Sequence, residues 1–200
     1  MSVLFVGPGG DAVADVLRDV GKQVRLSIST SNAAAVVELW DSAADRNNVD
    51  NQLAAGRHVL YFGHGYEDVL GDPALVDTGN IGGVASCVVL AMCCSSAKQL
   101  GEDAVNQHKI KAYLGFTRPI FIPVSQGTWS LTPWYIAGTQ LVTGANAGVV
   151  EREMRQALFN EGDRVFHNQL PDFETAVNDM FVHYGMAHTF VCLGDRSATL

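Results

Sequence analysis

The chain has 200 residues, of which 48% are hydrophobic and 17% charged, and its formal net charge is −8. This length predicts one domain over residues 1–200, and the apolar composition excludes a largely disordered chain. No window of 18 or more apolar residues predicts a membrane span, and an acidic chain without a basic run is not expected to bind nucleic acid. The N-terminal residues lack the pattern of a secretion signal, so we expect a cytoplasmic protein.

The predicted elements alternate between strand and helix, and Asp11 is expected to cap the first helix. In the first third of the chain we expect strands at Val3–Gly7, Gln23–Ser29 and Arg57–Phe62, and helices at Ala12–Val20, from Ser31 or Asn32 towards Trp40, and at Val49–Ala55. A loop with several glycines over residues 66–83 follows the third strand.

The remainder of the chain continues the alternation. We expect strands at Cys87–Met92, Ile110–Phe116 and Thr189–Leu193, helices from Ser95 or Ser96 towards Gln107 and at Pro133–Thr143, Ala145–Asn160 and Phe173–Met186, and a loop with a short β segment over 117–130. Strands separated by helices require crossover connections. The sequence therefore predicts a three-layer α/β/α sandwich with a mainly parallel central sheet.

Side chains able to carry out chemistry follow two of these strands. His64 and Gly65 come directly after the third strand, and Cys93 and Cys94 come directly after the strand ending at Met92. In open parallel sheets ligands bind beyond the carboxyl ends of the strands. A nearby imidazole and a helix beginning just after the cysteine would both favour the thiolate. The pattern predicts a nucleophile–base pair, although a hydrogen-bonded edge histidine and a core cysteine are the plainer interpretation.

No cofactor or metal ion is expected. The glycines of Gly7–Gly10 follow a strand but lack the spacing of a dinucleotide-binding loop, and no acidic residue ends the second strand. His183 and His188 are five residues apart, and no second cysteine pair suits a metal site. A disulfide framework is not expected in a chain with an adequate core and no secretion signal.

Four segments carry a resemblance to a known family. The strand and His-Gly of Arg57–Gly65, and the strand and cysteine of Val88–Ser96, resemble the caspase-like cysteine peptidases of clan CD. Their 29-residue separation across a glycine-rich loop is similar to the CHAT group, and Tyr135–Leu158 and Phe190–Asp195 resemble its later helices and closing strand. The resemblance covers residues 57–200 and implies a caspase-like form of the predicted sandwich.

The resemblance also implies roles for individual residues. His64 matches the catalytic histidine, Cys93 the nucleophile that forms an acyl-enzyme, and Gly65 the glycine whose N–H helps to hold the oxyanion. Successive residues at a strand end point in opposite directions, so only one of Cys93 and Cys94 can face His64, and the motif favours Cys93. Met92 departs from the small residue that is usual before the nucleophile.

The substrate preference is less well defined by the sequence. Ala91 stands where some relatives have an acidic or amide residue that shapes the pocket for the residue before the scissile bond, so no preference carries over. Asp11, Asp72 and Asp77 lie in segments able to line a substrate pocket, but each also suits a helix cap or a turn.

The interpretation favoured by these observations is a cysteine endopeptidase that acts on a protein or peptide substrate, in bacterial defence or regulated proteolysis. So compact a domain is expected to depend on a regulatory partner protein. One alternative is a caspase-like interaction module without catalysis. Another is a small α/β thiol protein of the redox or amidotransferase type, which is disfavoured because Met92 and Cys94, rather than glycines, flank Cys93.

Overall fold

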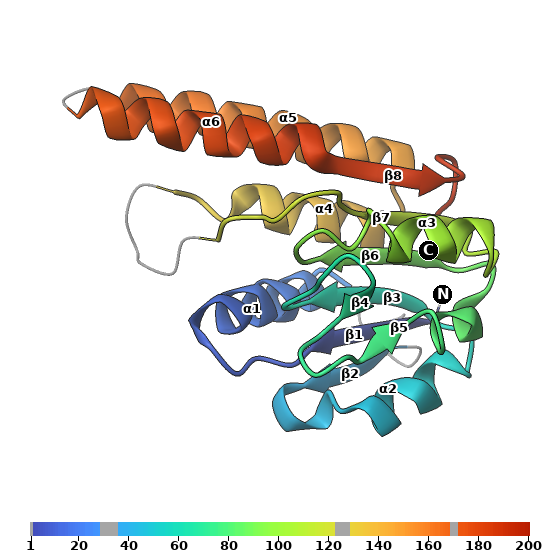
Figure 1. Ribbon diagram of the computed structural model, residues 1–200. Helices are drawn as coiled ribbons and strands as arrows, with labels where there is room; N and C mark the ends of the chain where they lie inside the picture. The colour runs from blue at the N-terminus through green and yellow to red at the C-terminus, as the bar shows by residue number, and fades with distance from the viewer. Residues whose placement is uncertain (1, 29–35, 123–128, 169–171) are drawn as a thin grey trace.

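A six-stranded sheet forms the centre of the computed structural model, which describes residues 2–28, 36–122, 129–168 and 172–200 (Figure 1). The strand order is β2-β1-β3-β6-β7-β8, in which neighbouring strands are parallel except β8, which is antiparallel to β7. The strands are β1 (Val3–Gly7), β2 (Val36–Trp40), β3 (His58–Phe62), β6 (Val88–Met92), β7 (Ala112–Phe116) and β8 (Phe190–Gly194). A separate hairpin pairs β4 (Val69–Leu70) with β5 (Val76–Asp77).

Helices cover both faces of the sheet (Figure 1). The helices are α1 (Ala12–Leu26), α2 (Arg46–Leu53), α3 (Leu100–Asn106), α4 (Thr132–Val142), α5 (Ala147–Asn168) and α6 (Phe173–Thr189), with short 3-10 turns η2 (Asp41–Ala43) and η3 (Ile81–Val84). One face carries α1, α4 and α5, the other carries α2 and α3, and α6 packs along α5 before it leads into β8. Among the described residues, no helix is both long and apolar enough to cross a membrane.

Two apolar cores, one on each face, hold the three layers together. Along β3, Leu60 and Phe62 point into the core under α1 and α4, while Val59 and Tyr61 point into the core under α2 and α3. All four side chains are buried, and burial of each large apolar side chain contributes about 1.5–3 kcal/mol to folding. This alternation explains the run of apolar residues that the sequence shows in each central strand.

The predicted α/β/α sandwich with a mainly parallel sheet is confirmed, but the predicted strand Gln23–Ser29 is wrong. Helix α1 continues through that segment to Leu26, and Ser29 lies outside the described residues. Leu17, Val20 and Val24 lie on one buried helical face at intervals of three and four residues. A short alternation of apolar and polar residues within this longer helical pattern produced the false strand signal.

The helix predicted towards Trp40 is also wrong over the part that the structure describes. Val36–Trp40 forms β2, the edge strand beside β1, and residues 31–35 lie outside the described ranges. The helix expected at Val49–Ala55 begins earlier, at Arg46, because the Asp45 side chain caps it by accepting the Asn48 N–H.

The bounds of other helices and loops also differ from the predicted ones. Helix α3 begins at Leu100 rather than at residue 95 or 96, after a turn in which Ser95 has a φ of 54°. Helix α5 extends to Asn168, beyond the expected end at residue 160. The expected loop 66–83 contains the β4–β5 hairpin, and no strand occurs in residues 117–122 or 129–130, with 123–128 outside the described part.

Candidate active site

The parallel pairing of β3 with β6 brings the predicted site residues to one edge of the sheet. Phe62 is in register with Met92, so His64 and Cys94 each lie two residues beyond that pair. Both residues line a pocket of about 400 Å³, which we call the thiol pocket. The pocket is completed by Gly65, Tyr66, Glu67, Ser95 and Pro119.

Cys93 lies beneath this pocket rather than on its wall. It continues the alternation of Val89 and Ala91 into the core under α2 and α3, and it is 0% exposed. This burial raises the pKa of its thiol to about 12. A Cβ placed on Gly65 would lie 2.5 Å from the Cys93 Sγ, so the two residues pack tightly. The placement differs from the sequence-based expectation that Cys93 faces His64.

Cys94 points to the other side and is only partly buried. Its Sγ accepts a hydrogen bond from the Ile120 N–H at 3.4 Å, and the thiol lies 3.8 Å from the Ile120 carbonyl oxygen. Because sulfur forms only weak hydrogen bonds, these contacts orient the thiol and leave it available to react. The structure therefore brings Cys94, and not Cys93, to the pocket that His64 lines.

Asp11, the N-cap residue of α1, also holds the imidazole of His64. One carboxylate oxygen caps α1 by accepting the N–H groups of Val13 and Ala14 at 2.9 Å, and the other lies 2.6 Å from His64 Nε2. The hydrogen bond from Ala14, followed by that from His64, lowers the pKa of Asp11. An ionised Asp11 fixes the proton of neutral His64 on Nε2, which leaves Nδ1 as the basic nitrogen.

The helix-cap role of Asp11 agrees with the sequence, but its pairing with His64 was missed. The two residues are 53 positions apart, so no local signal reports their contact. The role of Tyr61 in the site was also not predicted, because its position in an apolar strand indicates only a core residue. It is fully buried, and its hydroxyl donates a 2.6 Å hydrogen bond to the His64 carbonyl oxygen, which fixes the backbone of that residue.

Gly65 connects the site to the β4 hairpin. It forms a bridge with Leu70, made by the Tyr66 N–H to the Val69 oxygen and the Gly71 N–H to the His64 oxygen. The Gly65 N–H therefore takes no part in the bridge. An N–H group beside the pocket that is not used by the hairpin suits a donor to an oxyanion.

The two other aspartates proposed to line a substrate pocket have different surroundings. Asp72 accepts a hydrogen bond at 3.1 Å from the hydroxyl of Tyr66, a residue of the pocket, and itself lines a neighbouring pocket beside Pro8 and Gly9. Asp77 lies in an ion-pair cluster with Arg46 and does not line the thiol pocket.

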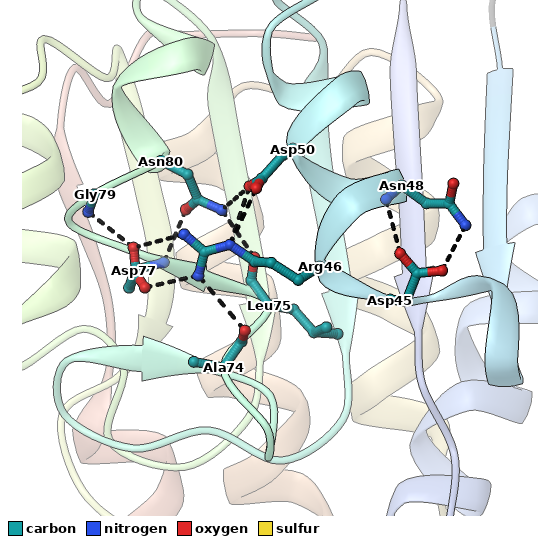
Figure 2. Close-up of polar contacts among 9 residues, drawn as sticks. All are labelled: Asp45, Arg46, Asn48, Asp50, Ala74, Leu75, Asp77, Gly79 and Asn80. Carbon is teal, nitrogen blue, oxygen red and sulfur yellow. Dashed lines mark hydrogen bonds and ion pairs between the residues drawn. The ribbon is translucent and has the colours of Figure 1, made fainter.

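This ion-pair cluster, which we call the Arg46 cluster, consists of Arg46, Asp50, Asp77 and Asn80 (Figure 2). The Arg46 guanidinium donates to both oxygens of Asp77 at 2.7 and 3.2 Å, and the Asn80 amide donates to Asp50 at 2.5 Å. The hydrogen bond from Arg46 is the main reason that the pKa of Asp77 is lowered. The cluster ties α2 to the β4–β5 hairpin.

The remaining titratable groups do not form a metal site in the part of the chain that the structure describes. There, no three histidine, cysteine, aspartate or glutamate side chains lie close enough to hold a metal ion together. All four cysteines have free thiols, and Cys87 and Cys192 lie away from the thiol pocket.

The structure is similar to solved structures of cysteine proteinases. It matches the Arg-specific cysteine proteinase gingipain R (RgpB) with a TM-score of 0.60 and 14% identity, over 100% of this chain and 47% of that one. It also matches the complex of the pro- and mature domains of RgpB from Porphyromonas gingivalis, with a TM-score of 0.61 and 14% identity, over 100% and 48%. No family model and no curated protein matches the sequence.

These comparisons define the fold. The chain has the caspase-like α/β fold of gingipain, a clan CD cysteine proteinase. It spans about half the length of the chains that it matches. At 14% identity the likeness shows the fold alone, so the chemistry has to be argued from the site itself.

Proposed function

We propose that this chain is a cysteine peptidase in which His64 activates the thiol of Cys94. The observation that carries the proposal is the shared pocket: a thiol and an imidazole line the same cavity beyond the carboxyl ends of two parallel strands. Ligands bind at this edge in open α/β sheets. The caspase-like fold, common to cysteine proteinases, supports the same reaction class.

The proposed reaction follows from the groups around the pocket. His64 Nδ1 takes the proton of the Cys94 thiol, and the thiolate attacks the carbonyl carbon of a peptide bond. The Gly65 N–H donates to the oxyanion that forms, and the imidazolium then gives its proton to the departing amine. Water hydrolyses the resulting thioester and releases the second product. Asp11, ionised beside Nε2, orients the imidazole.

Burial supports Cys94 over Cys93 as the acting thiol. A thiol must ionise before it attacks, and the apolar surroundings of Cys93 oppose ionisation, as its pKa of about 12 reflects. The sequence resemblance to the CHAT group, by contrast, aligns Cys93 with the family nucleophile. We retain His64 as the base. We assign the attack to Cys94, the residue directly after Cys93, because Cys94 lines the pocket and Cys93 does not.

A regulatory protein partner also belongs to this proposal. One structural neighbour is a complex of the pro- and mature domains of RgpB, which supports the binding of a protein partner by such a fold. The resemblance to the CHAT group suggests a setting in regulated proteolysis or bacterial defence, and four free cysteines agree with the cytoplasmic location proposed from the sequence. A caspase-like interaction module without catalysis is the alternative that a test of activity must address.

The test compares wild type with Cys94→Ala, Cys93→Ala and His64→Ala. Each protein is incubated with a peptide library and with peptide-based thiol-reactive probes, and its fold is checked by circular dichroism. We expect Cys94→Ala and His64→Ala to lose cleavage by about 10³-fold or more, and Cys93→Ala to retain cleavage and labelling.

Other outcomes would change the assignment in distinct ways. Cleavage that survives Cys94→Ala but not Cys93→Ala would transfer the nucleophile to Cys93. Cleavage that survives the loss of both thiols would refute a cysteine peptidase. A folded wild type that is neither labelled nor active on any peptide would favour the interaction module.

A further inference from the structure

An apolar groove lies next to the thiol pocket, between the segment that follows β7 and helix α6. Its volume is about 320 Å³, and we define it by six of its lining residues: Pro119, Ile120, Phe121, Phe181, Val182 and Met186. Two of them are conspicuously exposed, since Phe121 is 59% and Phe181 61% accessible to solvent. The aromatic residues of β3 and β7, in contrast, are fully buried.

Contacts with Trp129, and through it with α6, hold Phe121 in place. The Phe121 ring packs against Trp129, with ring centroids 5.3 Å apart, and the Trp129 ring in turn contacts the buried His183 of α6 at 4.3 Å. The Trp129 indole N–H donates to Asp179 of the same helix at 3.0 Å. These contacts fix both walls of the groove relative to each other. A preformed apolar concavity with exposed aromatic rings marks a binding surface.

The groove is continuous with the thiol pocket. Pro119 lines both cavities. The backbone joins them as well, because the Ser95 N–H donates to the Arg118 carbonyl oxygen at 3.1 Å and the Ile120 N–H donates to the Cys94 Sγ at 3.4 Å. The groove therefore begins directly beside the Cys94 thiol. An extended peptide advances about 3.3 Å per residue, so side chains close to a bond held at Cys94 reach the groove.

We propose that the groove is a substrate subsite that binds a bulky apolar side chain of the polypeptide, such as leucine or phenylalanine, within three residues of the scissile bond. This inference rests on the proposed peptidase function and adds a substrate class to it. The occupant is an extended segment of substrate because the groove adjoins the reacting thiol rather than a separate surface. A small or charged side chain would leave the two phenylalanine rings in water and gain no apolar burial there.

The test uses paired fluorogenic peptides that differ at one position, with leucine in one member and serine in the other. The position is moved through three residues on each side of the cleaved bond. Wild type is compared with Phe181→Ser and with the matched control Phe173→Ser. Phe173 lies on the same helix and is 63% exposed, but it packs against Phe166 and does not line the groove.

We expect wild type to prefer leucine at one position by at least 10-fold in kcat/KM. Phe181→Ser should reduce that preference at least fivefold, whereas Phe173→Ser should leave it unchanged. Equal use of leucine and serine peptides by wild type, or a preference that persists in Phe181→Ser, would overturn the subsite.

A binding measurement separates failure of the subsite from failure of the peptidase. The same peptides, labelled with a fluorophore, are titrated into Cys94→Ala and into Cys94→Ala/Phe181→Ser, and fluorescence anisotropy is recorded. Leucine-dependent binding that Phe181→Ser weakens, without cleavage by wild type, would keep the groove and refute the peptidase. Sedimentation of wild type as a dimer that Phe181→Ser dissociates would show that a second copy occupies the groove, and would overturn the proposal.

Discussion

The thiol pocket and the Arg46 cluster both contain charged and polar side chains, but they differ in how completely those side chains are hydrogen-bonded. In the Arg46 cluster, Asp77 accepts from both guanidinium nitrogens and from the N–H of Gly79, and the Asn80 amide bridges Asp50 and the Leu75 carbonyl oxygen (Figure 2). In the pocket, Cys94 has only weak sulfur contacts, and the Gly65 N–H takes no part in the adjacent bridge.

This difference distinguishes polar groups that stabilise the fold from polar groups that are available to a ligand. A cluster whose donors and acceptors are satisfied by one another fixes the relative position of the elements that carry them. A pocket with a thiol, a basic nitrogen and an N–H group still available is suited to act on a ligand. Changes in the pocket should therefore affect activity more than stability, and changes in the Arg46 cluster should do the reverse.

Among the changes that test this comparison, the largest effect is expected at Gly65, where the pocket packs against the core. Gly65→Ala would place a Cβ 2.5 Å from the Cys93 Sγ and 2.9 Å from its Cβ. We expect this substitution to displace His64 and Cys94, to lower kcat/KM by about 100-fold or more, and to cost about 1–3 kcal/mol of stability. Urea unfolding and peptide hydrolysis measure the two effects.

A second substitution tests whether the clash is the cause. Cys93→Gly removes the two closest atoms that the new Cβ would meet and leaves the Cys94 carbonyl oxygen at 3.3 Å. In the Gly65→Ala/Cys93→Gly double variant, the stability loss caused by Gly65→Ala should be smaller than in the Cys93 background. Equal losses in the two backgrounds would contradict the packing explanation.

A smaller effect, confined to activity, is expected from Asp11→Asn. Asparagine still accepts the N–H groups at the start of α1, so the cap is preserved, but it removes the negative charge beside His64 Nε2. We expect kcat/KM to fall by about 10- to 100-fold with an unchanged melting temperature. The matched control is Asp45→Asn, because Asp45 caps α2 and has no histidine partner. Equal losses of activity in the two variants would reduce Asp11 to a helix cap.

The smallest effect is expected in the Arg46 cluster and concerns stability alone. Arg46→Gln should destabilise the fold by about 1–2 kcal/mol at pH 7, since both partners are partly exposed and screened by solvent. Activity per folded molecule should be unchanged. Arg152→Gln, which breaks only an exposed pair with Glu153, should change stability by less than about 0.5 kcal/mol.

The pH dependence of this effect has a definite sign. Arg46 lowers the pKa of folded Asp77 below its ordinary value of 3.8. The stabilisation is therefore complete above that value and is lost as the pH falls through the lowered pKa of the folded state. Urea unfolding of wild type and Arg46→Gln should show a gap that narrows below about pH 4. A gap that widens in acid would contradict the assigned pairing.

Much of the fold could be predicted because the central strands are long apolar runs that end in glycine, histidine or cysteine. Val59–Phe62 and Val88–Met92 are buried on both faces, so each reads as a parallel strand without tertiary information. The edge strand β2 was mistaken for a helix because it is only partly buried and carries no continuous apolar run. The reversed direction of β8 was not predicted either, since strand sequences do not report the sense of their pairing.

The sequence by itself determined that a histidine, a glycine and two cysteines follow neighbouring strands, because parallel strands expose their carboxyl ends at one edge. Only the tertiary structure decided which cysteine reaches the pocket. The Phe62–Met92 register and the alternation of β6 direct Cys93 into the core and Cys94 towards the pocket that His64 lines. The same is true of Asp11 and His64, whose contact depends on how α1 packs against the sheet, a property of the whole chain rather than of any local pattern.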